Sequence, residues 1–138
     1  MGKNDIIHLF EAHEVKPTAN RIIIAEALAD ARRPLSLTEL ENMLETVDKS
    51  VIYRSLTLFK EHRLVHIIED GSDGVRYELC HSHDYHHDED QHAHFYCENC
   101  HKTFCLEDTP VPEVTLPEGF KKQTVNYVIK GVCPDCRK

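Results

Sequence analysis

The sequence has no long hydrophobic run, and its longest apolar stretch is only a few residues. A membrane-spanning helix needs about 20 predominantly apolar residues, so we expect no transmembrane segment. The N-terminus, MGKND, lacks the apolar core of a secretory signal, and the Ser or Thr of a myristoylation motif is also missing. These absences predict a soluble, cytoplasmic protein with no membrane partner.

Basic residues are also few, since 16 Lys and Arg stand against 24 Asp and Glu, giving a net charge of −8. Such an acidic balance argues against nucleic acid as a partner. The acidity is uneven, however, because residues 1–63 carry a net charge of −1 and residues 64–138 carry −7. The first half can therefore still present a local basic face, whereas the acidic, histidine-rich second half suits divalent cations.

Motifs of metalloenzymes are absent as well. The chain contains no HExxH, and no paired carboxylates lie near an evident pocket. A metal site filled by four protein side chains would leave no open position for water or substrate. We therefore expect no enzymatic activity and no small organic substrate.

Cysteine, in contrast, occurs in a specific pattern. Four of the six cysteines form two CxxC pairs, Cys97 with Cys100 and Cys133 with Cys136. Two CxxC turns supply the tetrahedral sulfur set of a structural Zn²⁺ site. Two disulfides or a thioredoxin-like redox motif are the alternatives, but a redox CxxC needs no second pair and no secretory signal precedes these cysteines. The spacing therefore predicts structural zinc, which a chain of 138 residues can use to stabilise a small domain.

Four helices are predicted in the N-terminal half. An amphipathic segment begins at Ile6, and Thr18 is a candidate N-cap for the second helix. The third begins at the sequence SLTE, residues 36–39, a capping box whose first and last side chains each satisfy a free backbone donor. Asp48 is a candidate cap for a fourth helix that runs to about His62.

The fourth helix has two faces of different chemistry. Ile52, Leu56 and Phe59 recur at helical spacing, which predicts a stripe that faces the core. The opposite face is polar, aromatic and cationic. It consists of Ser50, Tyr53, Arg54 and Thr57.

Two strand-like segments follow, residues 64–68 and 75–79, separated by the turn sequence GSDG. Helices followed by a hairpin form a winged helix, in which the helix after the turn enters the DNA major groove. Tyr53 and Arg54 are the kind of side chains that meet base edges and phosphates there. A helical bundle with an ordinary solvated face is the alternative.

Six of the eleven histidines lie in residues 80–94, between the hairpin and the first CxxC. His92 and His94, with one residue between them, would project from the same side of a strand and can bind one metal. For the other four we prefer a solvated polar loop. These are His81, His83, His86 and His87.

Several motifs together resemble the ferric uptake regulator (Fur) superfamily. They are KPTANR at 16–21, SVIYRSL at 50–56, RYEL at 76–79 and HAHFYCENC at 92–100, in the family's order over nearly the whole chain. The resemblance implies an α+β fold: a winged-helix DNA-binding domain (1–79), a His-rich hinge (80–91) and a small α/β dimerisation domain with a Cys₄ zinc site (92–138). It also implies a homodimeric, metal-responsive bacterial repressor that binds a palindromic operator in double-stranded DNA.

Roles for single residues are carried over by position. The four CxxC cysteines match the family's structural zinc ligands. Tyr53 and Arg54 match its recognition-helix contacts. Lys16 and Arg21 lie where family members approach the DNA backbone or the minor groove.

For the sensing site the chain resembles the zinc uptake regulator (Zur) branch, where the positions of His66 and Cys80 supply ligands beside His92 and His94. Three imidazoles and one thiolate suit Zn²⁺, whereas Fe²⁺ sites favour more oxygen and higher coordination. An iron-responsive or peroxide-sensing regulator is the alternative within the family. A zinc-buffering protein would explain the histidines and the acidity, but not the polar face of the fourth helix.

Two positions leave the ligand set open. Glu78 matches a carboxylate ligand of iron-sensing members, and it is a fifth ligand, a partner of a ligand or a surface residue. Cys105 stands where many members have an acidic ligand, and it is either a small hydrophobe or a soft extra ligand that would favour zinc. The proline-rich stretch 109–119 replaces a longer helix of the family, so we expect that helix to be lost or trimmed.

Overall fold

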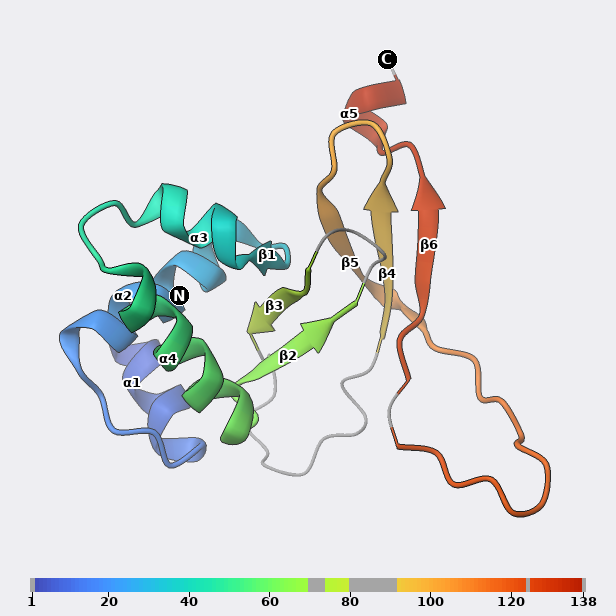
Figure 1. Ribbon diagram of the computed structural model, residues 1–138, viewed down its shortest axis with the longest axis horizontal. Coiled ribbons are helices and arrows are strands. Elements are labelled where there is room, and N and C mark those ends of the chain that lie inside the picture. The colour runs from blue at the N-terminus through green and yellow to red at the C-terminus, as the bar shows by residue number, and fades with distance from the viewer. Residues whose placement is uncertain (1, 70–73, 80–91, 124, 138) are drawn as a thin grey trace.

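The computed structural model describes residues 2–69, 74–79, 92–123 and 125–137, which form a helical half and a β-rich half (Figure 1). Within these ranges no helix is long and apolar enough to cross a membrane. The helical half runs α1 (Lys3–Ala12), α2 (Ala19–Ala31), β1 (Leu35–Ser36), α3 (Leu37–Met43), α4 (Lys49–Glu61), β2 (Val65–Ile68) and β3 (Arg76–Leu79). The β-rich half runs β4 (His92–Cys97), β5 (Thr103–Pro110), β6 (Val128–Gly131) and α5 (Pro134–Arg137). This order confirms the predicted α+β class.

The helices begin where the capping residues predict. Thr18 Oγ1 accepts a hydrogen bond from the Arg21 N–H at 3.3 Å at the start of α2. At the start of α3, Ser36 Oγ accepts from the Glu39 N–H at 3.1 Å, and Glu39 Oε1 accepts from the Ser36 N–H at 3.0 Å. Asp48 occupies the N-cap of α4, although its side chain makes no capping hydrogen bond.

The hydrophobic core lies among the four helices and one face of the first sheet. Ile52, Leu56 and Phe59 of α4 are fully buried in it, as their spacing predicts. Phe59 packs against Phe10 of α1 with ring centroids 5.6 Å apart. Burial of this stripe leaves the opposite face of α4 exposed to solvent.

β3 is the central strand of the first sheet, whose order is β1-β3-β2. Side chains alternate between the two faces of a strand. Tyr77 and Leu79 belong to the helical core, and the alternation therefore turns Arg76 and Glu78 to the other face. Since all four residues are buried, both faces of β3 are covered. The polar face of β3 is therefore where the helical half meets the rest of the chain.

The second sheet has the order β5-β4-β6, with β5 antiparallel and β6 parallel to β4. An irregularity in the register separates His92 from Ala93. Between β5 and β6 the chain follows a long excursion (Figure 1), and its described residues, 111–123 and 125–127, contain no helix. This segment agrees with the expectation that a helix is lost or trimmed here.

Candidate functional site

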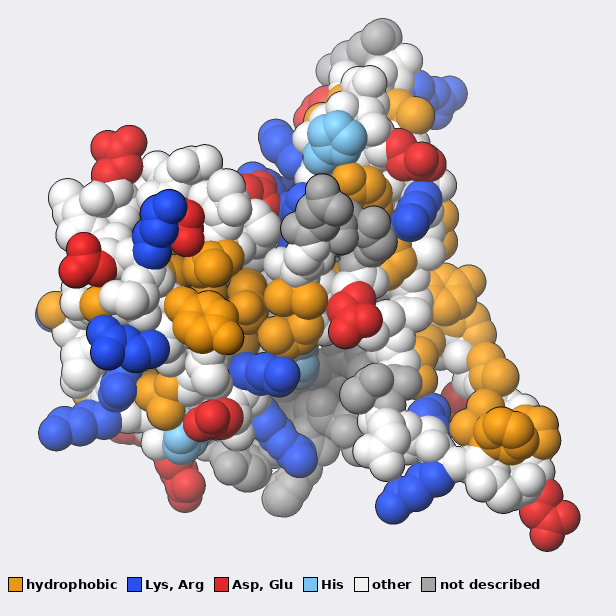
Figure 2. Space-filling model, viewed as in Figure 1, with side chains coloured by type: hydrophobic (Ala, Val, Ile, Leu, Met, Phe, Trp, Pro, Cys, Tyr) orange, Lys and Arg blue, Asp and Glu red, His pale blue; other side chains and the backbone are white. Residues whose placement is uncertain are grey.

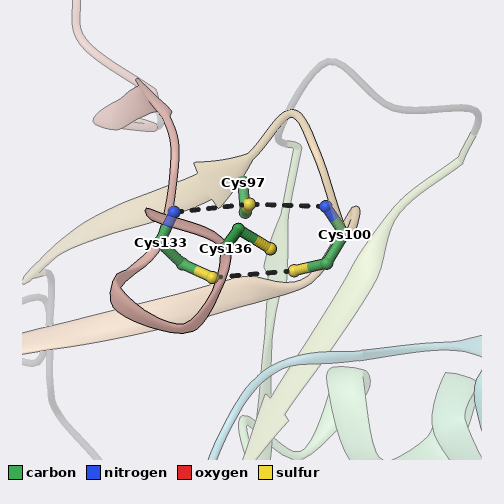
Figure 3. Close-up of side chains that lie close together, drawn as sticks. All are labelled: Cys97, Cys100, Cys133 and Cys136. Carbon is green, nitrogen blue, oxygen red and sulfur yellow. Dashed lines mark hydrogen bonds between the residues drawn. The ribbon is translucent and has the colours of Figure 1, made fainter. Parts of the chain in front are cut away.

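The four CxxC cysteines meet at one end of the second sheet (Figure 3). Cys97 ends β4 and Cys100 follows in the turn, while Cys133 precedes α5 and Cys136 lies within it. Their four sulfur atoms all lie within 4.8 Å of one another, with Cys100 and Cys133 at 3.8 Å. A tetrahedron with metal–sulfur bonds of about 2.3 Å places its sulfur atoms about 3.8 Å apart. The cluster therefore fits a tetrahedral metal ion.

Disulfides do not explain this cluster. Cys97, Cys100, Cys133 and Cys136 form no disulfide with one another. The Cys100–Cys133 separation of 3.8 Å far exceeds a disulfide bond of about 2.05 Å. A metal ion held by all four sulfur atoms would have a closed tetrahedral coordination shell.

Backbone N–H groups prepare Cys97 to act as a thiolate. Its sulfur accepts hydrogen bonds from the N–H of Cys100 and of Cys133, each at 3.4 Å (Figure 3). The Cys100 N–H, followed by that of Cys133, outweighs burial and lowers the pKa of Cys97 to about 6. For Cys136, the Asn99 side chain lowers the pKa, but hydrogen bonding to Cys133, burial and the other thiols raise it to about 11.

A second cluster joins the two halves of the chain. Glu78 of β3 meets His94 of β4 and Cys105 of β5, and their ligand atoms lie within 4.8 Å of one another. His94 Nε2 and Glu78 Oε2 are 2.8 Å apart. Both residues are buried, with 9% and 5% of their surfaces exposed, so the interpretation of Glu78 as a surface residue is wrong. One carboxylate, one imidazole and one thiol can together hold a divalent cation.

Strand register places His66 beside this cluster. His66 on β2 lies directly opposite Glu78 on β3, as His94 on β4 lies opposite Cys105 on β5. Directly opposite residues in an antiparallel pair share one face, with their Cβ atoms about 4.5–5.5 Å apart. The pair on the first sheet, His66 and Glu78, therefore lies next to the pair on the second sheet, His94 and Cys105. Glu78 and His94 are in direct contact.

Part of the predicted sensing set lies outside the described residues. Cys80 is the member of the set that lies there. The four histidines of the predicted polar loop, His81, His83, His86 and His87, also lie outside the described residues. The backbone of His92 forms the first residue of β4, and its side chain is also outside the description. Of the four predicted sensing residues, the structure therefore describes the side chains of His66 and His94.

The polar face of α4 is open to solvent. Its four side chains are all exposed, and Tyr53 exposes 56% of its surface. Two of them also bond to the helix itself: Arg54 Nε donates to the Ser50 carbonyl at 3.2 Å, and the Thr57 hydroxyl to the Tyr53 carbonyl at 2.9 Å. These residues can contact a large partner along one helix face.

Lys16 and Arg21 lie at the loop before α2. Lys16 is exposed. Arg21 Nη1 donates a hydrogen bond to the Lys16 carbonyl at 2.8 Å, so this guanidinium supports the loop that carries Lys16. The two residues form one basic feature at the start of α2.

Sequence reasoning did not identify Arg76. It lies two residues before Glu78 on β3, and its guanidinium contacts Glu39 of α3 and the backbone carbonyl of His101. Alternation along β3 was the available signal, because a charged residue two positions from Glu78 shares its face.

Comparisons with known proteins agree with this architecture. The family model described as "Ferric uptake regulator family" matches residues 12–128. The ferric uptake regulation protein of Campylobacter jejuni (subsp. jejuni serotype O:2) is 35% identical over 92 residues, 63% of this chain and 54% of that protein. The match thus spans about half the length of that relative.

Solved structures share the fold over nearly the whole chain. A zinc uptake regulator complexed with zinc and DNA has a TM-score of 0.68 and 19% identity, covering 98% of this chain and 92% of that one. The Helicobacter pylori ferric uptake regulator has a TM-score of 0.64 and 16% identity, covering 100% and 95%. At these identities the likeness shows the fold, and the family match over 12–128 decides the assignment: the chain belongs to the ferric uptake regulator family.

Proposed function

We propose that this protein is a metal-dependent, DNA-binding transcriptional repressor that controls zinc uptake genes. The observation that carries the proposal is the cluster of Glu78, His94 and Cys105, because its ligand atoms come from both halves of the chain. Membership of the ferric uptake regulator family supports the same function. So do the named relatives, one of which is a zinc uptake regulator solved with zinc and DNA.

Two metal sites are part of the proposal. The four CxxC cysteines would hold a structural Zn²⁺, which suits a closed set of four thiolates. The regulatory Zn²⁺ would be held by His66, Cys80, His92 and His94. Glu78 and Cys105 are candidate additional ligands, because their ligand atoms lie within 4.8 Å of that of His94.

The chemistry of the second cluster favours zinc. Thiolates are soft ligands that select zinc over iron, and imidazole suits both metals. Cys105 stands at the corner of the cluster where the family usually has a carboxylate, which shifts the set towards zinc. The buried carboxylate of Glu78 favours the second candidate, an iron-responsive regulator, because Fe²⁺ sites contain more oxygen.

Metal binding would favour DNA binding by fixing the orientation of the helical half relative to the β-rich half. Glu78 is fixed on β3, while His94 and Cys105 are fixed on β4 and β5. A bound cation would attach these groups to one point, and the groups would then restrict the angle between the two sheets. A population shift of this kind is ordinarily worth about 5- to 150-fold in affinity.

The DNA-binding surface would be the exposed face of α4, with Ser50, Tyr53, Arg54 and Thr57 in the major groove. Lys16 and Arg21 would approach the backbone or the minor groove from the start of α2. A homodimer would present two copies of α4 to a palindromic operator, one in each of two successive major grooves.

The β-rich half would form the dimer interface. Six of its large apolar side chains are exposed, on the segment between β5 and β6, on β6 itself and just after it (Figure 2, right). They are Val114, Leu116, Phe120, Tyr127, Ile129 and Val132. β6 is also an edge strand of its sheet, so its outer backbone groups can pair with another chain.

Metal titration tests the proposal. Metal-free protein is mixed with a fluorescent fragment of its own promoter, and anisotropy is followed as Zn²⁺ or Fe²⁺ is added. We expect Zn²⁺ to induce binding, and His94→Ala and Cys105→Ser to remove that response in a folded dimer. His8→Ala, an exposed histidine on α1, is the matched control.

Two outcomes would change the conclusion. If Fe²⁺ alone induces binding, the zinc assignment is wrong and the iron-responsive candidate replaces it. If neither metal alters binding to promoter DNA, the metal-dependent repressor proposal fails.

A further inference from the structure

We propose that Arg76 is a positioning residue that couples the Cys97–Cys100 turn to the start of α3, so that the four-cysteine site also sets the DNA-binding half. Arg76 is buried, with 6% of its surface exposed. One end of its guanidinium contacts the Glu39 carboxylate of α3. Its Nη2 donates a hydrogen bond to the His101 carbonyl oxygen at 2.6 Å. A single side chain therefore contacts both halves.

The acceptor of this bond is fixed by the CxxC turn. His101 follows Cys100 directly, has a positive φ of 63°, and its N–H donates to the Cys97 carbonyl at 2.9 Å. The direction of its carbonyl therefore depends on the turn that brings Cys97 and Cys100 together. If that turn opens, Arg76 loses its acceptor in the β-rich half.

The other end of the connection sets the start of α3. Glu39 is the third residue of that helix, and its Oε1 accepts from the Ser36 N–H at 3.0 Å. Its second oxygen, Oε2, pairs with Arg33 Nη1 at 2.7 Å. The Glu39 carboxylate thus accepts the capping hydrogen bond at the start of α3 and also contacts two guanidinium groups. Helix α3 in turn packs against α4. A displaced Arg76 would change the position of α3, and through it that of α4.

Arginine is suited to this role and lysine is not. A guanidinium has donors in a rigid planar fork and can serve two acceptors in different directions, whereas an ammonium is a compact point charge. Because Arg76 is buried, loss of either acceptor would leave its donors without compensation from water. The two ends of the connection are therefore coupled.

Amide hydrogen exchange on the zinc-loaded full-length chain, with and without a zinc chelator, tests the coupling. In the wild type, chelation should raise exchange in the 97–101 turn and also in α3. In Arg76→Lys, chelation should still raise exchange in the turn but no longer in α3. Arg33→Ala is the matched control, because it removes the other guanidinium that contacts Glu39 and leaves the Arg76–His101 hydrogen bond in place. In this variant α3 should remain sensitive to chelation.

DNA binding gives the second measurement, and this arm rests on the proposed function. Arg76→Lys should lower the affinity of the zinc-loaded protein for promoter DNA by about 5- to 150-fold, the ordinary range of such couplings. Its zinc content should be unchanged. Arg76→Met, which removes the charge, should show the same loss of coupling, and Arg76→Lys decides the result if that variant does not fold.

The outcomes separate the two proposals. If α3 responds to chelation equally in Arg76→Lys and in the wild type, or in neither, the coupling is wrong. If the coupling is found in exchange but the wild type does not bind promoter DNA, the proposed function fails and the role of Arg76 stands.

Discussion

His13 and His62 each donate an imidazole Nδ1–H to the backbone carbonyl of the other, and both distances are 3.0 Å. Each residue is the C-cap of a helix, His13 of α1 and His62 of α4. The assignment of the donor follows from the partner, because a carbonyl oxygen can only accept. This reciprocal pair joins the end of α4 to the end of α1.

The two helix ends repeat the same backbone design. Val15 N–H donates to the Phe10 carbonyl at 2.8 Å, and Leu64 N–H donates to the Phe59 carbonyl at the same distance. The residue before each of these donors has a positive φ, as expected at the end of a helix that closes with a Schellman-type bond. The C-terminal ends of α1 and α4 therefore have the same backbone conformation and the same pattern of hydrogen bonds.

Removing either histidine should destabilise the helical half. His62→Ala leaves the His13 carbonyl without its donor, and we expect a loss of about 1–3 kcal/mol in the free energy of unfolding. His13→Ala should cost at least as much, because His13 is 1% exposed and its removal also leaves a cavity. Urea unfolding measures both. His8→Ala, on the exposed side of α1, should change stability by less than about 0.5 kcal/mol, and equal losses in all three variants would contradict the role of the pair.

Local signals were sufficient to predict most elements of the helical half, but not the shortest strands. The capping box at Ser36 and Glu39 fixes the start of α3 within a few residues of sequence. β1 consists only of Leu35 and Ser36, so no alternation precedes it, and it exists through its pairing with β3. β6 has two exposed central residues and becomes a strand by parallel pairing with β4. Pairing between distant segments is not written in a local pattern.

The candidate sites differ in the same way. Each CxxC spacing brings two thiols together within one turn, so the cysteine cluster was predictable once two such turns were present. The meeting of Glu78 with His94 and Cys105 depends on how two separate sheets pack. The sequence therefore left three interpretations of Glu78 open, and burial removes one of them.

Glu39 should make stability depend on pH. Burial raises the pKa of its carboxyl, but the Ser36 N–H and the guanidinium groups of Arg33 and Arg76 outweigh burial and lower the pKa below its ordinary value. A lowered folded-state pKa gives stability that is present above the unfolded pKa and is lost as pH falls through the folded one. Glu39→Gln should therefore cost about 0.5–1.5 kcal/mol at neutral pH, and less in acid.

Urea unfolding at about pH 7 and about pH 3 measures this difference. Glu41→Gln is the matched control, because Glu41 forms a long, 3.6 Å ion pair with the exposed Lys49. A Glu39→Gln penalty that is the same at both pH values would show that the charge of Glu39 does not stabilise the fold.

Cys97→Ser and Cys105→Ser should have different consequences. Cys97 is the fully buried member of the first CxxC pair, and its sulfur accepts hydrogen bonds from two backbone N–H groups. Its loss should therefore release the structural metal and unfold the β-rich half. Cys105→Ser leaves that cluster intact and should remove only the response to regulatory zinc. Bound zinc and thermal unfolding distinguish the two. Equal stability of both variants would mean that the four cysteines do not hold a structural metal.

His66→Ala and Cys80→Ser should abolish zinc-stimulated operator binding while the dimer remains folded. His66 lies opposite Glu78 in the sheet, so its imidazole is placed on the face that carries the second cluster. A gel-shift assay with and without Zn²⁺ measures the response, and sedimentation measures the dimer. Unchanged zinc-stimulated binding in both variants would remove His66 and Cys80 from the regulatory site.

Lys16→Ala and Arg54→Ala should weaken DNA binding in different ways. Lys16 is exposed before α2, so loss of a phosphate contact should lower affinity for all sequences and reduce the salt slope by about 1. Arg54 lies on the exposed face of α4, and loss of a base contact should cost about 1–3 kcal/mol and relax sequence preference. Anisotropy at several salt concentrations, with promoter and scrambled DNA, separates the effects. Lys121→Ala, an exposed lysine of the β-rich half, is the control. If Lys16→Ala and Arg54→Ala both match this control, DNA does not bind to this face of the helical half.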